Sequence, residues 1–343
     1  MVLRREELAT FARTLGAAPG WLTCSADGGL QIPMSAVEVE SARAITAACL
    51  AAAGLLDSDR VVVALNSDGA GVGVLWSEAA SRVCAAATVT RPDGTRRLLG
   101  RLVAADATAL VCTPTAARQI VDVVTAERSL APCLRRIVLV GEIVEGPEAS
   151  ALAAALGCLV SEAWPDPVFG VALAWRDALT NTSFRRVEPS VLSVEMVSSS
   201  TGEWIVHPLW CEDLRGISYR SGIVSASTDP SVLDKPRWTT GDNLLARGRW
   251  LSFGSLEQVL DQFGVERWQL QVRRHGAGEQ IELVVEGPSS TTRIEEALRA
   301  ITPLRVDVRQ GHVAERAPRL HDERGHHIDR RPAVRESLAV SGR

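Results

Sequence analysis

Hydrophobic and polar positions follow two different rhythms along the chain. In the first half, short apolar runs at 61–65, 109–112, 136–140 and 158–160 alternate with segments of helical periodicity. Continuous apolar runs of this length, rich in β-branched residues, are typical of parallel strands buried on both faces. The helical segments between and before these runs are 6–15, 36–53, 98–105, 114–126 and 147–156. This alternation predicts βαβ units and a mostly parallel sheet flanked by helices.

The pattern changes near residue 190 to the alternation that is typical of antiparallel strands. Segments 192–196 and 203–206 flank the turn-forming segment 198–202, which predicts a hairpin. We expect the remaining elements in this order: helix 255–263, strands 267–274 and 279–286, helix 290–301, strand 304–309 and an irregular arm from 316. The predicted fold is α/β. It has a large N-terminal domain of mostly parallel sheets with flanking helices, 1–247, and a small C-terminal α+β domain, 248–343.

Composition excludes several classes of protein. The chain of 343 residues is 46% hydrophobic and 23% charged, as soluble globular proteins are. A net charge of −4 argues against a general nucleic-acid binder, which normally carries a basic surplus. No stretch reaches the roughly 20 apolar residues of a membrane span, and the start lacks the apolar core of a signal peptide. We therefore expect a cytoplasmic protein with neither nucleic acid nor a membrane as partner.

The seven cysteines stand singly among apolar neighbours, without a CxxC pair or another metal-like spacing. The histidines His321, His326 and His327 with Asp322 fit neither a helical pair nor a zinc-finger arrangement, so we expect a solvated segment and no metal site there. Lys235 is the only lysine, so 36 of the 37 basic residues are arginines. This excess is typical of a GC-rich genome and is weak evidence for an anion site.

Several short motifs occur in an informative order. Thr239-Thr240-Gly241-Asp242 is followed by Arg249 and by Phe253-Gly254-Ser255-Leu256-Glu257, a turn that leads through an arginine into a helix. Three earlier segments are Thr113-Pro114-Thr115, Val140-Gly141-Glu142 and Glu162-Ala163-Trp164. Together these segments resemble the adenylate-forming, or acyl-CoA synthetase, superfamily, and in particular its phenylacetate–CoA ligase branch. The resemblance covers most of the chain from about residue 20.

The resemblance implies a set of site residues. It places Thr23, Ser25 and Gly28 in a phosphate-binding loop and Gly141, Glu142 and Trp164 around the nucleotide. Asp242 is expected to accept hydrogen bonds from the ribose hydroxyls, and Arg249 to be the arginine of the hinge. Arg324 and His326 are the candidate catalytic residues. ATP or AMP with Mg²⁺ is the implied cofactor, CoA is a further one, and no protein-bound metal site is expected.

The motifs depart from the family pattern in three places. Asp27 stands within the phosphate loop, where a carboxylate repels phosphate. Pro165, Pro167 and Val168 replace the glycine, threonine and glutamate that follow the family's aromatic residue. The C-terminal lysine is absent, and His326 takes its position, although a neutral imidazole stabilises charge at a phosphate poorly.

Simpler explanations exist for two of these motifs. Thr240-Gly241-Asp242 is ordinary turn chemistry, and Trp164 between strands is often a core aromatic residue. Gly69 to Gly73 lacks the GxGxxG spacing of a dinucleotide loop.

Two classes of function follow from these residues. In the first, the chain binds and activates or transfers an aryl or acyl carboxylate by acyl-AMP or acyl-thioester chemistry in small-molecule biosynthesis. In the second, it is a catalytically degenerate family member that acts as a non-enzymatic ligand- or partner-binding protein. The expected partners are a small carboxylic acid or its acyl thioester and, if an acyl carrier or partner enzyme supplies what is missing, that protein as well. The sequence identifies neither the acid nor the acceptor, and it leaves the oligomeric state open.

Overall fold

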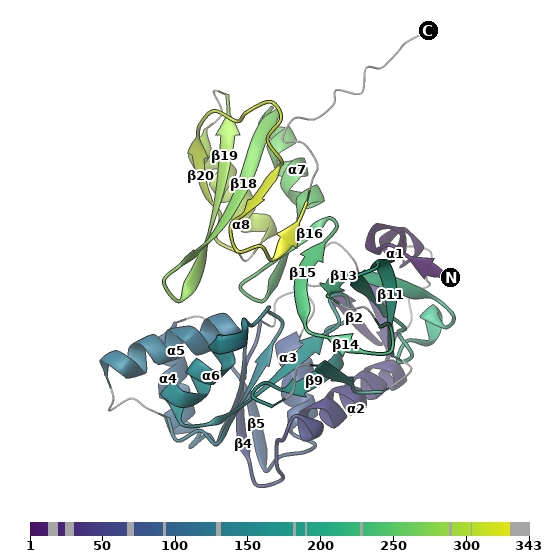
Figure 1. The fold of residues 1–343 in the computed structure, drawn as a ribbon, viewed down its shortest axis with the longest axis vertical. Coiled ribbons are helices and arrows are strands. Elements are labelled where there is room, and N and C mark those ends of the chain that lie inside the picture. The colour runs from purple at the N-terminus through teal and green to yellow at the C-terminus, as the bar shows by residue number, and fades with distance from the viewer. Residues whose placement is uncertain are drawn as a thin grey trace.

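The computed structural model describes residues 1–12, 20–24, 31–66, 72–91, 94–127, 132–180, 183–188, 191–226, 229–287, 290–302 and 304–329. The ribbon forms a large N-terminal part and a smaller C-terminal part, which meet at the hairpin β16–β17 (Figure 1). The expected α/β class is confirmed as a mixed α/β fold with several sheets.

The centre of the N-terminal part is an eight-stranded sheet of order β14-β10-β9-β8-β7-β6-β4-β5. Its parallel strands are β4 (Arg60–Ala64), β5 (Ala86–Val89), β6 (Ala109–Cys112), β7 (Arg136–Val140) and β8 (Leu159–Pro165). The antiparallel strands are β9 (Ala172–Asp177), β10 (Ser183–Arg186) and β14 (Leu233–Asp234). The four apolar runs in the sequence thus form the middle of this sheet, as predicted.

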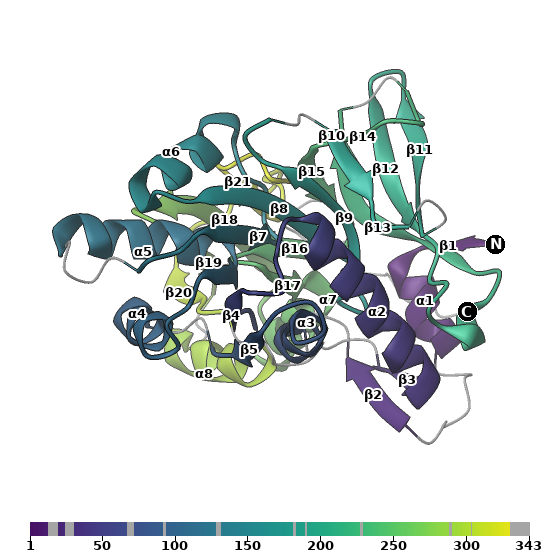
Figure 2. The same ribbon diagram turned by 90° about the horizontal axis from the view of Figure 1, so that it is seen from below.

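Helices cover both faces of this sheet. One face carries α4 (Thr95–Ala104), α5 (Pro114–Ala126) and α6 (Gly146–Leu156), and the other carries α2 (Ala36–Ala52) and α3 (Val72–Ala80) (Figure 2). Along β4, Val62 packs with the first set of helices and Val61 and Val63 with the second, because successive side chains of a strand point to opposite faces.

A second, mainly antiparallel sheet completes the N-terminal part. Its order is β11-β12-β13-β15-β22, with β1 (Val2–Leu3) beside β13. The predicted hairpin is confirmed as β11 (Leu192–Ser198) and β12 (Thr201–Val206), followed by β13 (Ser218–Ser225) and β15 (Pro236–Thr240). Smaller elements are α1 (Arg5–Ala12), the hairpin β2 (Gly20–Cys24) with β3 (Gln31–Ser35), and a 3₁₀ turn at Glu212–Leu214. The expectation of mostly parallel sheets therefore holds only for the part of the first sheet from β8 to the edge strand β5.

The C-terminal part has its own sheet and core. It comprises β16 (Asn243–Ala246), β17 (Arg249–Ser252), α7 (Phe253–Gln262), β18 (Arg267–His275), β19 (Gly278–Glu286), α8 (Thr291–Ile301), β20 (Asp307–Gln310) and β21 (Leu320–Asp322). Leu244, Ala246 and Leu251 of the β16–β17 hairpin pack in this core with α7 and α8. Leu245 and Trp250 of the same hairpin pack in the core of the N-terminal part, so the hairpin joins the two parts.

Residues 316–329 do not form the irregular arm that the sequence predicts, and the rest of that predicted arm lies outside the described residues. Leu320 to Asp322 forms β21, parallel to β18, and β22 (His327–Ile328) pairs in parallel with β15 of the N-terminal sheet. The Thr239 N–H donates to the His326 carbonyl at 2.7 Å. Short strands with polar residues carry little periodicity, so the sequence pattern does not reveal them. The returning strand β22 fastens the C-terminal part to the N-terminal sheet.

Candidate functional site at the domain junction

The β16–β17 hairpin covers the carboxyl ends of the central parallel strands. Its turn holds two residues with positive φ, Arg247 at 51° and Gly248 at 67°. A Cβ atom added to Gly248 would lie 2.5 Å from Cγ2 of Thr113, which follows β6. Only glycine permits so close an approach of backbone to side chain. Ligands of open α/β sheets bind at this edge, so the hairpin and the sheet edge together define the candidate site.

Glu142, which follows β7, places a buried carboxylate beside this turn. Its Oε2 accepts hydrogen bonds from the N–H of Thr115 at 3.1 Å and from the Thr115 hydroxyl at 2.7 Å. Its Oε1 has no hydrogen-bond partner among the described residues. Burial, and then the carboxylate of Glu279, raise the pKa of Glu142 to about 7. A carboxyl group that titrates near neutral pH is suited to proton transfer.

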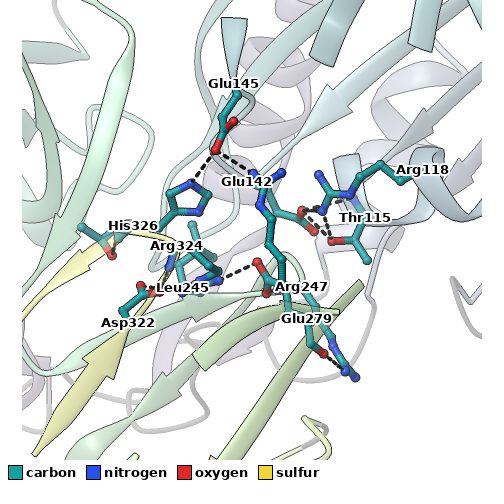
Figure 3. Close-up of polar contacts among 12 residues, drawn as sticks. Thr115, Arg118, Glu142, Glu145, Leu245, Arg247, Glu279, Asp322, Arg324 and His326 are labelled. Carbon is teal, nitrogen blue, oxygen red and sulfur yellow. Dashed lines mark hydrogen bonds and ion pairs between the residues drawn. The ribbon is translucent and has the colours of Figure 1, made fainter. Parts of the chain in front are cut away.

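Arginines link the two parts of the chain around this carboxylate (Figure 3). Arg118 on α5 lies 3.3 Å from the Glu142 carboxylate, pairs with Glu148, and donates to the Ala277 carbonyl of the C-terminal part at 2.9 Å. Conversely, an arginine of the C-terminal part, Arg274 on β18, pairs with Glu145 of the N-terminal part at 2.9 Å. Two contacts that cross the junction therefore hold the end of the β18–β19 hairpin against the N-terminal part.

The predicted catalytic residues Arg324 and His326 also lie in this junction. The Arg324 side chain is 1% exposed and pairs with Glu279 at 2.6 Å and with Asp322 at 2.8 Å. His326 comes within 3.9 Å of Glu145. Burial, and then the Arg324 guanidinium, lower the pKa of His326, so its ring is neutral at pH 7. Both residues line the same small cavity as the buried carboxylate after β7.

The arginines that line this cavity are already engaged by the protein. Carboxylates accept from three of them, and a Glu279 carbonyl accepts from the fourth; the four are Arg118, Arg274, Arg324 and Arg247. Adenylation of a carboxylate requires preorganised cations that face the phosphates. At this cavity Arg118 and Arg274 stabilise the contact between the two parts of the chain instead, and Arg247 and Arg324 pair within the C-terminal part.

A second cavity follows the first along the hairpin, since residues 245–247 line the first and residues 248–250 line the second. Three residues predicted at the nucleotide site line it together: Gly141, Trp164 and Arg249. Trp164 is buried and meets Trp204 edge to face, with ring centroids 6.1 Å apart. Trp164 is thus a core aromatic residue that reaches the cavity wall, and it offers a ligand only part of its ring.

Asp242 lies beside a third and larger cavity, which shares Trp250 with the second. Its carboxylate pairs with Arg319 at 2.9 Å. Arg319 also pairs with Glu257 at 2.5 Å and with Asp329 at 2.6 Å. The Asp242 side chain is 41% exposed, so the carboxylate is accessible to a ligand, and its binding of ribose stays a prediction.

The predicted phosphate loop is described only in part. Thr23 lies in β2, opposite Ile32 of β3, and its side chain lies outside the described part of the structure. Ser25 and Gly28 lie outside the described residues altogether. Their role in binding phosphate remains a prediction.

The structure thus distributes the predicted residues over three adjoining cavities along one hairpin. Glu142, Arg324 and His326 share the first, and Asp242 lines the third. The sequence did not identify Arg118, Glu279 or Arg319, although these residues organise the junction. For Arg118 a signal existed, since it lies in the first turns of the helix that opens at Thr113-Pro114.

Within the described ranges, no group of three or more His, Cys, Asp or Glu side chains is arranged to hold a metal ion. None of the helices described combines the length and apolar character that crossing a membrane requires.

The raised pKa of Glu142 makes the stability of the protein depend on pH. Between about pH 4.5 and 7 the folded state binds more protons than the unfolded state, so the unfolding free energy falls as pH rises through this window. The effect is at most about 3.5 kcal/mol, since the pKa rises from 4.5 to about 7 and one pKa unit corresponds to ~1.4 kcal/mol. In urea unfolding, Glu142→Gln should lose this part of the pH dependence. If the difference in unfolding free energy between wild type and Glu142→Gln stays constant from pH 5 to 8, the raised pKa of Glu142 is contradicted.

The chain is similar to known proteins in its fold, whereas its sequence matches neither a family model nor a curated protein. Among solved structures, a 2-hydroxyisobutyryl-CoA ligase in complex with 2-HIB-AMP and CoA in the thioesterification state is similar over 95% of this chain and 80% of that one, with a TM-score of 0.73 and 15% identity. The same ligase in the postadenylation state, with R3-HIB-AMP, gives a TM-score of 0.53 at 16% identity over 94% of this chain and 80% of that one.

Other enzymes share the fold at similarly low sequence identity. A malonyl-CoA ligase with methylmalonyl-CoA and AMP bound has a TM-score of 0.61 and 16% identity over 83% of this chain and 68% of that one. The amide bond synthetase McbA from Marinactinospora thermotolerans has a TM-score of 0.60 and 14% identity over 85% and 65%. The chain therefore has the fold of the acyl-CoA and other adenylate-forming ligases.

Proposed function

We propose that this chain binds a carboxylic acid in activated form, as an acyl adenylate or acyl thioester, and transfers the acyl group to an acceptor. The single observation that carries this proposal is the docked position of the β16–β17 hairpin, with Gly248 against Thr113 at the carboxyl ends of the parallel strands. The closer match to a thioesterification state than to a postadenylation state of one ligase, 0.73 against 0.53, supports the same arrangement.

The cavities along this hairpin suit the two portions of an acyl adenylate. The second cavity has Val72, Val140 and Trp250 in its wall, which favours the apolar part of an acyl group. Asp242 and Arg220 line the larger polar cavity, which favours the nucleotide portion of an acyl adenylate. Closing the hairpin over the sheet edge excludes water, which would otherwise hydrolyse the activated acyl group.

Acyl transfer is favoured over the formation of the adenylate from ATP. The described arginines at the junction are paired with protein acceptors, and the only lysine, Lys235, follows β14 rather than lying in the C-terminal part. The described residues therefore do not fit a Mg²⁺-bound triphosphate at this cavity, and we derive no adenylation step. Assignment to the phenylacetate–CoA ligase branch and a role in biosynthesis remain parts of this proposal.

The second candidate is a non-catalytic protein that binds the same ligands. The pairing of Arg324 with two buried carboxylates favours it, because this cation is neutralised within the protein. Transfer of an acyl group to CoA distinguishes the two candidates, since a binding protein retains affinity without turnover.

Calorimetric titration tests the proposed ligands. The probes are AMP, CoA and a panel of acylsulfamoyl adenosines, which are stable mimics of acyl adenylates. We expect micromolar binding of at least one mimic and a loss of about tenfold or more in Asp242→Ala, about the value of a charge-assisted hydrogen bond. Glu257→Gln is the matched control, because Glu257 pairs with the same Arg319 but does not line the third cavity. Absence of binding for every probe up to millimolar concentration would overturn the proposal.

A further inference from the structure

The two oxygens of the Glu142 carboxylate have different surroundings. Oε2 is held by the Thr115 N–H and hydroxyl and by Arg118, whereas Oε1 is buried without a partner in the described structure. A buried acceptor that lacks a hydrogen bond costs stability. The contacts to Oε2 fix the direction of the carboxylate, and they leave Oε1 available to accept a proton.

The unpartnered oxygen lies beneath the turn of the β16–β17 hairpin. An added Cβ on Gly248 would stand 3.5 Å from Oε1, so this oxygen packs against the backbone of the turn. Gly141, the preceding residue, lines the second cavity, and Glu142 itself lines the first. Oε1 has almost no exposed surface while the turn is docked, so an acceptor that approaches an acyl carbon in the second cavity reaches Oε1 only as the turn moves aside.

We propose that Glu142 is the general base that removes the proton from an acceptor thiol during acyl transfer. The proposal rests on the proposed function. In this step the S–H proton moves to Oε1, the sulfur forms a bond to the acyl carbon, and the bond from that carbon to the phosphate oxygen breaks. AMP leaves with the electron pair, and Glu142 then releases its proton to solvent.

The charges around Glu142 suit this role. Groups that face it come from α5, β6, the hairpin, β18, β19 and the returning C-terminal segment, and they are Arg118, Cys112, Arg247, Arg274, Glu279, Arg324 and His326. Burial and Glu279 raise the proton affinity of the carboxylate, and Arg118 lowers it. The resulting pKa of about 7 is near the optimum for a base at neutral pH.

The kinetic test compares wild type with Glu142→Gln in transfer from synthetic acyl adenylates to CoA between pH 6 and 9.5. We expect the rate of acyl transfer by the variant to be about 100-fold lower than that of wild type at pH 7, since general-base catalysis contributes roughly 10²–10⁴-fold. The loss should shrink at high pH, where the thiol ionises without help, while binding of the adenylate mimic is unchanged. Glu127→Gln is the control: it changes an exposed carboxylate at the end of α5 that pairs with Arg96, and it should leave the rate unaltered.

The outcomes separate this inference from the proposed function. Equal rates and pH profiles for wild type and Glu142→Gln would overturn the base while leaving acyl transfer intact. Absence of transfer by wild type from every adenylate would overturn both. A measurement without substrate is infrared difference spectroscopy of the whole protein, in which a protonated carboxyl band should disappear as pH rises through about 7 and be missing in Glu142→Gln. A spectrum in which the variant retains that band would also overturn the assignment.

Discussion

Gly248→Ala should abolish docking of the hairpin and reduce acyl transfer by about 100-fold, the scale expected when reacting groups are displaced by roughly 1 Å. The alanine methyl would lie 2.5 Å from Cγ2 of Thr113, a distance that forces the hairpin and the sheet edge apart. The site between them would then open to water. Small-angle scattering should report a larger radius of gyration for the variant than for wild type.

The matched control for this experiment is Gly264→Ala. Gly264 has nearly the same backbone conformation, with φ of 64° against 67°, but nothing lies within 4 Å of its added Cβ. Both variants therefore bear the strain of a non-glycine residue at positive φ, about 1–2 kcal/mol, and only Gly248→Ala bears the clash. If Gly248→Ala and Gly264→Ala transfer acyl groups equally well, the docked position of the hairpin is not required for acyl transfer.

Arg324→Met should lower the unfolding free energy by about 3–5 kcal/mol, the usual cost of removing one partner from a buried ion pair. The substitution leaves the carboxylates of Glu279 and Asp322 without their cation, and the side chains of both are at most 6% exposed. Urea denaturation monitored by tryptophan fluorescence measures the effect, since Trp268 packs in the hydrophobic core of the C-terminal part.

The control for Arg324 is Arg309→Met. Arg309 pairs with Glu282 in the same sheet at 2.8 Å, but its side chain is 49% exposed, and exposed pairs contribute about 0–1 kcal/mol. A loss below ~1 kcal/mol in Arg324→Met, together with a loss of ligand affinity, would show that Arg324 serves the ligand, as the sequence predicted, and would contradict its role as a structural ion-pair partner.

Local sequence patterns predicted most of the individual elements. The apolar runs 109–112 and 136–140 became β6 and β7, and the helix predicted at 114–126 is α5 with the same ends. Thr113 explains the accuracy at that helix, because its side chain accepts from the Ala116 N–H as an N-cap. Signals of this kind depend only on neighbouring residues, which a sequence displays directly.

The candidate site could be predicted only in part, because its interactions join distant residues. Arg319 reaches Asp242, 77 positions earlier in the chain, and Arg118 donates to Ala277, 159 positions later. Nothing local distinguishes these arginines from the other arginines of the chain. The motifs did identify Glu142 and the helix that begins near Thr115, but they gave no reason to expect that the Thr115 hydroxyl orients the carboxylate.

Single-turnover transfer to CoA tests the proposed acyl transfer most directly. Synthetic adenylates of aryl and of small branched acids would be mixed with excess protein and CoA, and the thioester measured by mass spectrometry against a protein-free control. We predict that at least one adenylate forms thioester much faster than the control, and that Gly248→Ala loses this rate while Gly264→Ala keeps it. Thioester formation at the protein-free rate for every adenylate would contradict acyl transfer as the function of this chain.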